Sequence, residues 1–258
     1  MTAFDAFLLG ILQGFTELLP ISSSGHLVLA ESWLQVGIPA DLQSFDILLH
    51  VGSLLALLLT YPMLWWRMLQ SLCTGERPHR HLLFIIVLAS IPAGLAGGYF
   101  EQFIAVHLRS LSFVGIGFAA TAVLLVLAER MPQRKDTSRI SWVHALIIGC
   151  AQACALPPGL SRSGLTIAAA RFLGWRRESA VEFSFLLAVP VIAGASLFTT
   201  KDLLYGVSLP SLPIMGAGIL ASFGSSVIAI LFLRAMVRRF SLAWFALYLI
   251  PLAVLLLA

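Results

Sequence analysis

Charged residues are scarce in this chain. Asp, Glu, Lys and Arg together make up 11% of its 258 residues, against 59% hydrophobic residues. A soluble domain of this length could not bury so much apolar side chain, so the composition excludes the ordinary soluble classes and predicts an integral membrane protein. Arginines gather at 130–139, 171–177 and 234–239. We interpret these clusters as orientation signals and lipid-headgroup contacts, and we expect no nucleic-acid partner.

Cysteine is rare as well. Cys73, Cys150 and Cys154 show neither a paired disulfide framework nor a metal-binding spacing with histidine, so we interpret them as inert packing residues. No lysine or arginine precedes Arg67. Because a secretory signal begins with a positively charged segment, we expect no cleavable signal here.

Long apolar runs, by contrast, are abundant. Six of them approach the ~20 residues that a helix needs to cross a bilayer, and they cover 45–66, 82–100, 111–129, 181–200, 213–233 and 240–258. Two further apolar regions, 4–35 and 141–174, are interrupted by E-L-L-P-I-S-S-S-G-H at 17–26 and P-P-G-L-S-R-S-G-L-T at 157–166. Each region is either one span followed by a loop or a re-entrant hairpin of two half-helices.

The distribution of lysine and arginine separates these alternatives, because cytoplasmic loops carry an excess of both. With one full span in each broken region, the basic residues divide eight against eight, and no orientation is favoured. With two re-entrant hairpins, thirteen lie on one side and two, Arg109 and Lys201, on the other, while Arg162 lies within the second hairpin. The sequence therefore predicts two hairpins, with both termini outside the cytoplasm.

The two halves of the chain also repeat each other. At an offset of 139 residues, identities link Gly10 with Gly149, Gln13 with Gln152, Ser22 with Ser161, Ser24 with Ser163 and Gly25 with Gly164. At an offset of 138, the pattern F-x-x-L-L-x-V beginning at Phe45 returns at Phe183. Each half is then a re-entrant hairpin plus three transmembrane helices, and the odd number of crossings inverts the second half. We predict one all-α membrane domain over 1–258, with repeats at about 1–130 and 141–258 and hairpin tips that meet near mid-membrane.

The hairpin tips carry the polar side chains that suit an anion. Their returning arms begin with Ser22-Ser23-Ser24-Gly25 and Ser161-Arg162-Ser163-Gly164. Serine is a favoured N-cap, and a helix N-terminus offers free N–H groups and positive partial charge. A guanidinium such as that of Arg162 forms two parallel hydrogen bonds to phosphate. Irregular backbone at membrane depth persists only where protein buries it or water reaches it, so an anion site at the tips is predicted.

Acid–base groups accompany this predicted anion site. Gln13 and Glu17 are four residues apart and share one helical face, and His26 follows on the first turn of the returning arm. A carboxylate, an imidazole, hydroxyls and an arginine around an anion suit hydrolysis of a phosphate ester or anhydride. The alternatives are structural: Glu17 and Arg162 as an ion pair that locks the tips, and serines that only cap turns. The cost of charge inside a membrane favours function for Glu17, His26 and Arg162.

Other polar residues receive structural interpretations. His50 lies inside an apolar span and is interpreted as a satisfied core residue. Gln13 and Gln152 are expected to satisfy backbone polar groups. Asp46 and Glu182 lie near span ends, where a solvated or helix-starting carboxylate is the default.

Three motifs together resemble one family: G-F-T-E-L-L-P-I-S-S-S-G-H, P-G-L-S-R-S-G-L-T and E-F-S-F-L-L-A-V-P. The chain is similar over nearly its whole length to undecaprenyl-diphosphate phosphatases, also called bacitracin-resistance proteins. The resemblance implies a re-entrant inverted-repeat fold and hydrolysis of undecaprenyl diphosphate, a C55 isoprenyl lipid, to the monophosphate at the outer face of the bacterial plasma membrane. That reaction recycles the lipid carrier of peptidoglycan and other envelope polymers and confers bacitracin resistance.

Motif residues and resemblance together assign roles at the site. The catalytic candidates are Glu17, Ser22, Ser23, His26 and Arg162, and the phosphate-binding candidates are Gly25, Ser161, Arg162, Ser163 and Thr166. The resemblance also implies a divalent cation, Mg²⁺ or Ca²⁺, with Glu17 and Gln13 as its protein ligands. Because the family's E/Q-x-x-x-E motif has glutamine first here, we expect the substrate diphosphate to bridge the ion and water to complete its shell.

The sequence leaves three questions open: the nucleophile, the choice between enzyme and carrier, and the oligomeric state. The nucleophile is Ser23, our preference, or Ser22, or His26 through a phosphohistidine, or water. A transporter of an anion or lipid phosphate is the rival function, because inverted repeats with broken helices also build transporters. A pure carrier has no need of Glu17 and His26 beside the phosphates, and phosphate release in detergent separates the two functions. Oligomeric state stays undetermined.

Overall fold

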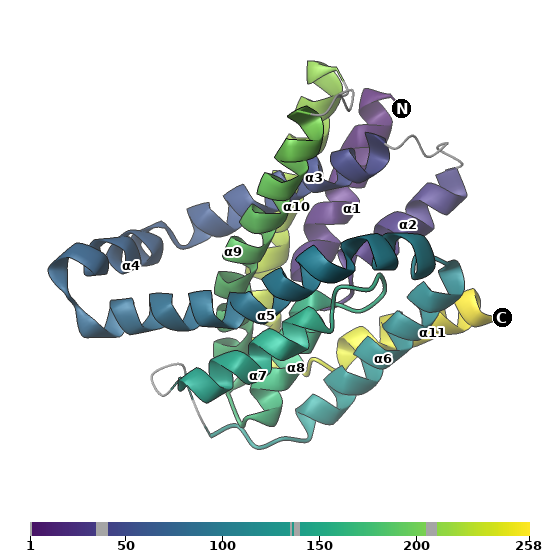
Figure 1. Ribbon diagram of the computed structural model, residues 1–258. Coiled ribbons are helices and arrows are strands. Elements are labelled where there is room, and N and C mark those ends of the chain that lie inside the picture. The colour runs from purple at the N-terminus through teal and green to yellow at the C-terminus, as the bar shows by residue number, and fades with distance from the viewer. Residues whose placement is uncertain (1, 35–40, 135, 137–139, 205–210) are drawn as a thin grey trace.

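The computed structural model describes residues 2–34, 41–134, 136, 140–204 and 211–258, which form helices and no β-strand (Figure 1). The first half contains α1 (Ala3–Leu18), α2 (Ser23–Leu34), α3 (Asp41–Thr60), α4 (Pro62–Thr74), α5 (Arg77–His107) and α6 (Leu111–Glu129). The second contains α7 (Trp142–Ala153), α8 (Arg162–Phe172), α9 (Arg177–Leu204), α10 (Leu212–Arg239) and α11 (Trp244–Leu257). The prediction of an all-α membrane protein is confirmed.

The two broken regions are helical hairpins, α1 with α2 and α7 with α8 (Figure 1). Leu19 ends α1 in an extended conformation, which is the preference of a residue before proline. Ser22 then turns the chain with a φ of 72°. In the second hairpin, the Pro-Pro-Gly sequence makes the break, and Gly159 has a φ of 91°, a conformation that glycine adopts without strain.

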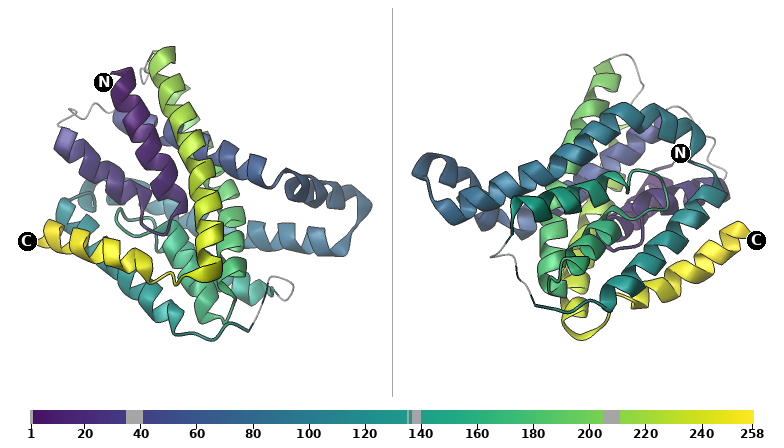
Figure 2. Two further views of the ribbon diagram at one scale, coloured as in Figure 1. Left: turned by 180° about the vertical axis from the view of Figure 1, so that it is seen from behind. Right: turned by 60° about the horizontal axis from the view of Figure 1, so that its bottom comes forward.

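Each hairpin packs against a long helix of the other half. The first arm α1 lies along α10, the corresponding arm α7 lies along α5, and α6 packs on α11 (Figure 2). This reciprocal packing is what two inverted halves require, since α5 and α10 hold equivalent places in their halves. In all views the start of α1 and the end of α11 lie on the side away from α4 (Figures 1 and 2).

Small residues allow α1 and α10 to approach closely. A Cβ built on Gly14 would lie 2.1 Å from Ser225 Oγ and 2.3 Å from the Ser222 carbonyl oxygen. Ser226 Oγ lies 3.3 Å from the Gly14 carbonyl oxygen and 2.9 Å from Ser53 Oγ, so the contact is also polar. Small side chains and interhelical hydrogen bonds of this kind are how helices associate in lipid.

We therefore expect Gly14→Ala to destabilise the fold by about 1–3 kcal/mol, since the added methyl group meets backbone atoms that cannot rotate away. Thermal unfolding of the purified protein in detergent measures the effect. Gly224→Ala on α10 is the matched control, because a Cβ there meets nothing within 4 Å. Equal unfolding temperatures for the two variants would contradict the close contact.

Two spans differ from their predicted limits. Over 45–66, the chain bends by 79° between Leu48–Thr60 and Pro62–Thr74, because Pro62 lacks the N–H that would continue α3 and starts α4 instead. Over 240–258, α11 has only 14 residues, fewer than the ~20 of a full span. In the part of the chain that the structure describes, four helices are long and apolar enough to cross a membrane, or five with the bent pair.

Two interpretations of side chains at the surface are wrong. Arg171, from the 171–177 cluster, is fully buried and contacts no headgroup. It donates to the carbonyl oxygens of Met131, at 2.6 Å, and Trp175, so it ties α8 to the segment after α6. The three cysteines are free and exposed on the outside of the helices, and thus do not pack in the core.

Candidate active site

The tips of the two hairpins are joined by direct hydrogen bonds. Ser163 Oγ donates to the carbonyl oxygen of Leu19 at 2.9 Å. Ser161 caps α8 by accepting from the Gly164 N–H at 3.0 Å, and its own N–H donates to Thr121 Oγ1 at 3.1 Å. The turn at Ser161 is therefore held from both sides, which aims the N-terminus of α8 at the first hairpin.

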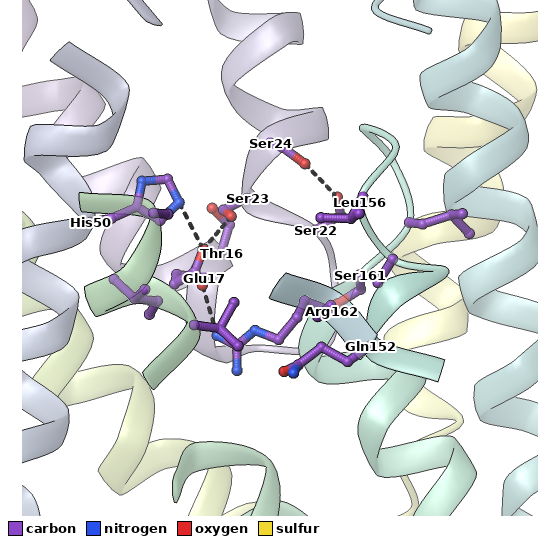
Figure 3. Close-up of a pocket in the computed structure, with 16 residues that line it drawn as sticks. Thr16, Glu17, Ser22, Ser23, Ser24, His50, Gln152, Leu156, Ser161 and Arg162 are labelled. Carbon is purple, nitrogen blue, oxygen red and sulfur yellow. Dashed lines mark hydrogen bonds and ion pairs between the residues drawn. The ribbon is translucent and has the colours of Figure 1, made fainter. Parts of the chain in front are cut away.

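A cavity of about 170 Å³ lies where the tips meet (Figure 3). Helices α5 and α9 contribute apolar wall residues. Its polar lining comes mainly from the two hairpins and consists of Thr16, Glu17, Ser22, Ser23, Ser24, His50, Gln152, Ser161 and Arg162. The structure thus brings together the interrupted segments that the sequence places 139 residues apart.

Glu17 is the centre of the polar contacts in this cavity, although its side chain is only 8% exposed. Its Oε1 accepts from Arg162 Nη2 at 2.7 Å. Its Oε2 accepts from Ser23 Oγ at 2.5 Å and from Gln13 Nε2 at 3.2 Å, and lies 3.3 Å from His50 Nε2. One carboxylate therefore orients a hydroxyl, an amide, an imidazole and a guanidinium.

His50 is a cavity residue that sequence reasoning missed. Its Nδ1 lies 2.7 Å from the Asp46 carbonyl oxygen, so this nitrogen is satisfied, as expected for a core residue. Its Nε2 faces Glu17. Carbonyl and carboxylate oxygens only accept, so a ring that carried protons on both nitrogens would donate to each of them. Arg162 then supplies the permanent positive charge beside Glu17, and a protonated His50 would add a second, which suits an anionic ligand.

Polar groups behind the cavity hold both the guanidinium and the backbone carbonyl of Arg162. Its Nη1 donates to the Ser184 carbonyl oxygen at 3.2 Å. Thr166 Oγ1 lies 2.8 Å from Ser184 Oγ and donates to the Arg162 carbonyl oxygen at 2.9 Å. Ser184, from the E-F-S-F segment of α9, was not among the predicted site residues. Ser184 thus holds the guanidinium, and Thr166 links the backbone of Arg162 to Ser184. Neither residue lines the cavity.

His26 is not among the residues that line the cavity. Its Nδ1 lies 2.7 Å from the Ser22 carbonyl oxygen, and its Nε2 lies 2.8 Å from the hydroxyl of Tyr248 on α11. The two rings stack with centroids 5.6 Å apart. Since the carbonyl oxygen accepts, Nδ1 carries the proton, and Nε2 shares a second hydrogen bond with the Tyr248 hydroxyl. Both nitrogens are therefore engaged behind the tip of the first hairpin.

The other predicted phosphate-binding residues divide into two groups. Ser161 and Arg162 line the cavity. Gly25, Ser163 and Thr166 lie behind it: the Gly25 N–H donates to Ser22 Oγ at 3.4 Å, and Ser163 and Thr166 make the tip-to-tip and α8–α9 contacts already described. Their place in the structure is to shape the turn that presents Ser22 and Arg162.

The donor set for a cation is small. No group of three or more His, Cys, Asp and Glu side chains suited to a metal occurs among the described residues. Glu17 reaches the cavity, whereas Gln13 is fully buried, and its Oε1 has no hydrogen-bond partner in the described chain. One carboxylate at the cavity suits an ion that takes most of its oxygen ligands from phosphate and water.

Comparison with known proteins points to one family over nearly the whole chain. A family model described as bacitracin resistance protein BacA matches residues 6–255. An undecaprenyl-diphosphatase of Alkaliphilus metalliredigens is 39% identical, with 96% of this chain and 95% of that protein covered. One of Aliivibrio salmonicida is 36% identical, with 96% and 94% covered. An undecaprenyl-diphosphatase 2 of Bacillus thuringiensis is 39% identical at the same coverage, 96% and 94%.

Proposed function

Because the chain belongs to the bacitracin resistance protein BacA family, we propose that it hydrolyses undecaprenyl diphosphate to undecaprenyl phosphate and inorganic phosphate. Membership confirms the family that the sequence motifs predicted. The observation that carries the proposal is the contact of Glu17 with both Ser23 and Arg162 in a cavity at the hairpin tips. Glu17 is there the proton acceptor, and it contacts both the nucleophile, Ser23, and the phosphate-binding cation, Arg162.

In the proposed mechanism, Ser23 Oγ attacks the terminal phosphorus of the diphosphate and gives its proton to Glu17 Oε2. The bond from that phosphorus to the bridging oxygen breaks, this oxygen takes the proton from Glu17, and undecaprenyl phosphate leaves. Water then hydrolyses the phosphoserine, releasing inorganic phosphate and restoring the hydroxyl of Ser23. Arg162 stabilises the charge on the transferred phosphoryl group. Ser23 is favoured over His26 because it lines the cavity and donates to Glu17, whereas both nitrogens of His26 are engaged behind the cavity.

A divalent cation, Mg²⁺ or Ca²⁺, belongs to the proposal. Glu17 would hold it from the cavity side, and the diphosphate and water would supply further ligands. Gln13, the second expected ligand, does not line the cavity. When bound, the ion neutralises charge on the diphosphate oxygens. The reaction steps assigned to Ser23 and Arg162 do not depend on where it lies.

The proposed location is the bacterial plasma membrane, with both termini and the active site on its outer side. The thirteen-to-two distribution of basic residues supports this orientation. The start of α1 and the end of α11 lie on a common side of the molecule (Figure 1), which supports placing both termini on the same face of the membrane. There the enzyme would recycle the lipid carrier for peptidoglycan and other envelope polymers and confer resistance to bacitracin. Its partners would be undecaprenyl diphosphate and the surrounding lipid.

Phosphate release in detergent tests the function. We expect the purified protein with Mg²⁺ to convert farnesyl diphosphate, a C15 prenyl diphosphate, to the monophosphate with one phosphate released per molecule. Detergent micelles have no two compartments, so a pure transporter gives no product. Absence of release with Mg²⁺ or Ca²⁺, from both the C15 and the C55 diphosphate, would overturn the phosphatase and leave an anion carrier.

A further inference from the structure

Gln152, in the last turn of α7, is a buried amide with unused hydrogen-bonding groups. Its side chain is 1% exposed and lines the cavity. Neither its Nε2 nor its Oε1 has a hydrogen-bond partner in the described part of the chain. Most buried polar side-chain atoms in proteins are paired, and an unpaired amide in an apolar setting is costly. Two unpaired atoms on one cavity residue therefore point to a ligand.

The inverted repeat shows how Gln152 differs from its counterpart Gln13. Gln13 donates to Glu17, four residues further along α1, at 3.2 Å. Four residues after Gln152 the chain has Leu156, which also lines the cavity. The second hairpin thus keeps the glutamine without the carboxylate that would accept from it. The expectation that Gln152 satisfies backbone polar groups is wrong, because no backbone atom of the described residues pairs with it.

Arg162 begins the other arm of the same hairpin and lines the cavity with Gln152. Figure 3 shows the two side chains on the same side of the cavity, below Glu17 in that view. Arg162 uses Nη2 on Glu17 and Nη1 on the Ser184 carbonyl oxygen, and a guanidinium has further N–H groups to offer. The amide of Gln152 adds two more donors, and a phosphate group presents several oxygens to accept them.

We infer that Gln152 binds the substrate, donating from Nε2 to a phosphate oxygen of the diphosphate beside Arg162. The identity of that ligand rests on the proposed function. Ser23 and Glu17 then approach the phosphoryl group from the first hairpin, while Gln152 and Arg162 hold it from the second. The glutamine that is left unpaired by the divergence of the two repeats has become part of the phosphate site.

Gln152→Met tests this assignment, because it keeps the length of the side chain and removes its donors. We expect kcat/KM for farnesyl diphosphate to fall about 10- to 100-fold, as for loss of a hydrogen bond to a charged group. The unfolding temperature should stay the same or rise, since an unpaired buried amide is lost. Gln152→Glu should lose more activity than Gln152→Met, because its carboxylate would repel the phosphate.

A second readout does not depend on hydrolysis. Inorganic pyrophosphate should raise the unfolding temperature of the wild type, and Gln152→Met should reduce that rise. Gln70→Met on α4, an exposed glutamine away from the cavity, is the matched control and should behave as wild type in both assays. The wild type could also release no phosphate, while Gln152→Met still loses the stabilisation by pyrophosphate. That result would overturn the phosphatase function and support the anion site at Gln152.

Two results would overturn the inference. One is wild-type kcat/KM and wild-type pyrophosphate stabilisation in Gln152→Met. The other is a Gln152→Glu variant that stays active and needs less Mg²⁺, since the amide would then face a cation and not a phosphate.

Discussion

Replacing Arg162 with lysine should lower kcat/KM for prenyl diphosphate hydrolysis by about 10³-fold, within the range seen when a donor to a transition-state phosphoryl or oxyanion group is removed. Lysine keeps the positive charge and has three N–H donors, but all of them lie on one nitrogen, so it lacks the planar fork with which Arg162 reaches Glu17 and the Ser184 carbonyl oxygen through separate nitrogens. Steady-state phosphate release measures the loss. The defect should lie in kcat as well as KM, because the guanidinium acts on charge that develops in the transition state.

A matched control separates the loss of catalysis in Arg162→Lys from the general effect of weakening an arginine–carboxylate ion pair. Arg177 also pairs with a carboxylate, Glu129, but outside the cavity. Arg177→Lys should therefore keep kcat/KM within about twofold, as expected for a substitution away from the reacting groups. Thermal unfolding of both variants shows whether they remain folded at the assay temperature. Similar activity in the folded Arg162→Lys variant and in wild type would remove Arg162 from the catalytic machinery.

The hairpins were predictable because their signals are local. Proline fixes the residue before it in an extended conformation, glycine permits the positive φ at Gly159, and serine caps the returning arm at Ser161. Each of these effects depends on a few neighbouring residues. The meeting of the two tips also followed from the sequence, since an odd number of crossings inverts the second half and lets its hairpin enter from the side opposite to the first.

The residues that sequence reasoning missed come from helices whose rotation is set by packing. His50 faces Glu17 because α3 packs on α10 and α1, and Tyr248 reaches His26 from 222 residues away on α11. An apolar helix in lipid is hydrophobic on all sides, so its sequence does not show which side faces the protein. Conversely, closeness in sequence suggested a cavity position for His26, which follows Glu17 by nine residues. Its ring instead contacts Tyr248, and His26 does not line the cavity.

Span limits failed for a related reason. Hydropathy measures how apolar a segment is, and it remains high across the bend at Tyr61 and into α11. The bend depends on one missing N–H at Pro62, which hydropathy does not register. Buried Arg171 is a similar case, because a count of basic residues does not show that its guanidinium finds the carbonyl oxygens of Met131 and Trp175.

Ser23→Ala should have the other large effect, a loss of about 10³-fold or more in kcat, as when a covalent nucleophile is removed. Ser23 Oγ donates to Glu17 Oε2 at 2.5 Å, so the same carboxylate that takes its proton also orients it. Because the two residues act as a unit, the double variant Ser23→Ala with Glu17→Gln should be little worse than the worse of the two single variants. Phosphate release by the three variants checks this non-additivity.

Two further results would identify Ser23 as the nucleophile: a larger loss of activity in Ser23→Ala than in His26→Ala, and a phosphorylated Ser23. His26→Ala should cost less than Ser23→Ala, about tenfold, because His26 lies behind the cavity and acts by holding the turn at Ser22. Acid quenching of the wild type during turnover should trap phosphate on Ser23, and mass spectrometry of the digested protein locates it. Since phosphohistidine survives base and phosphoserine survives acid, quenching in both conditions distinguishes the two residues. A phosphohistidine at His26, with Ser23→Ala still active, would require a rearrangement that frees His26 from Tyr248, and the serine mechanism would be wrong.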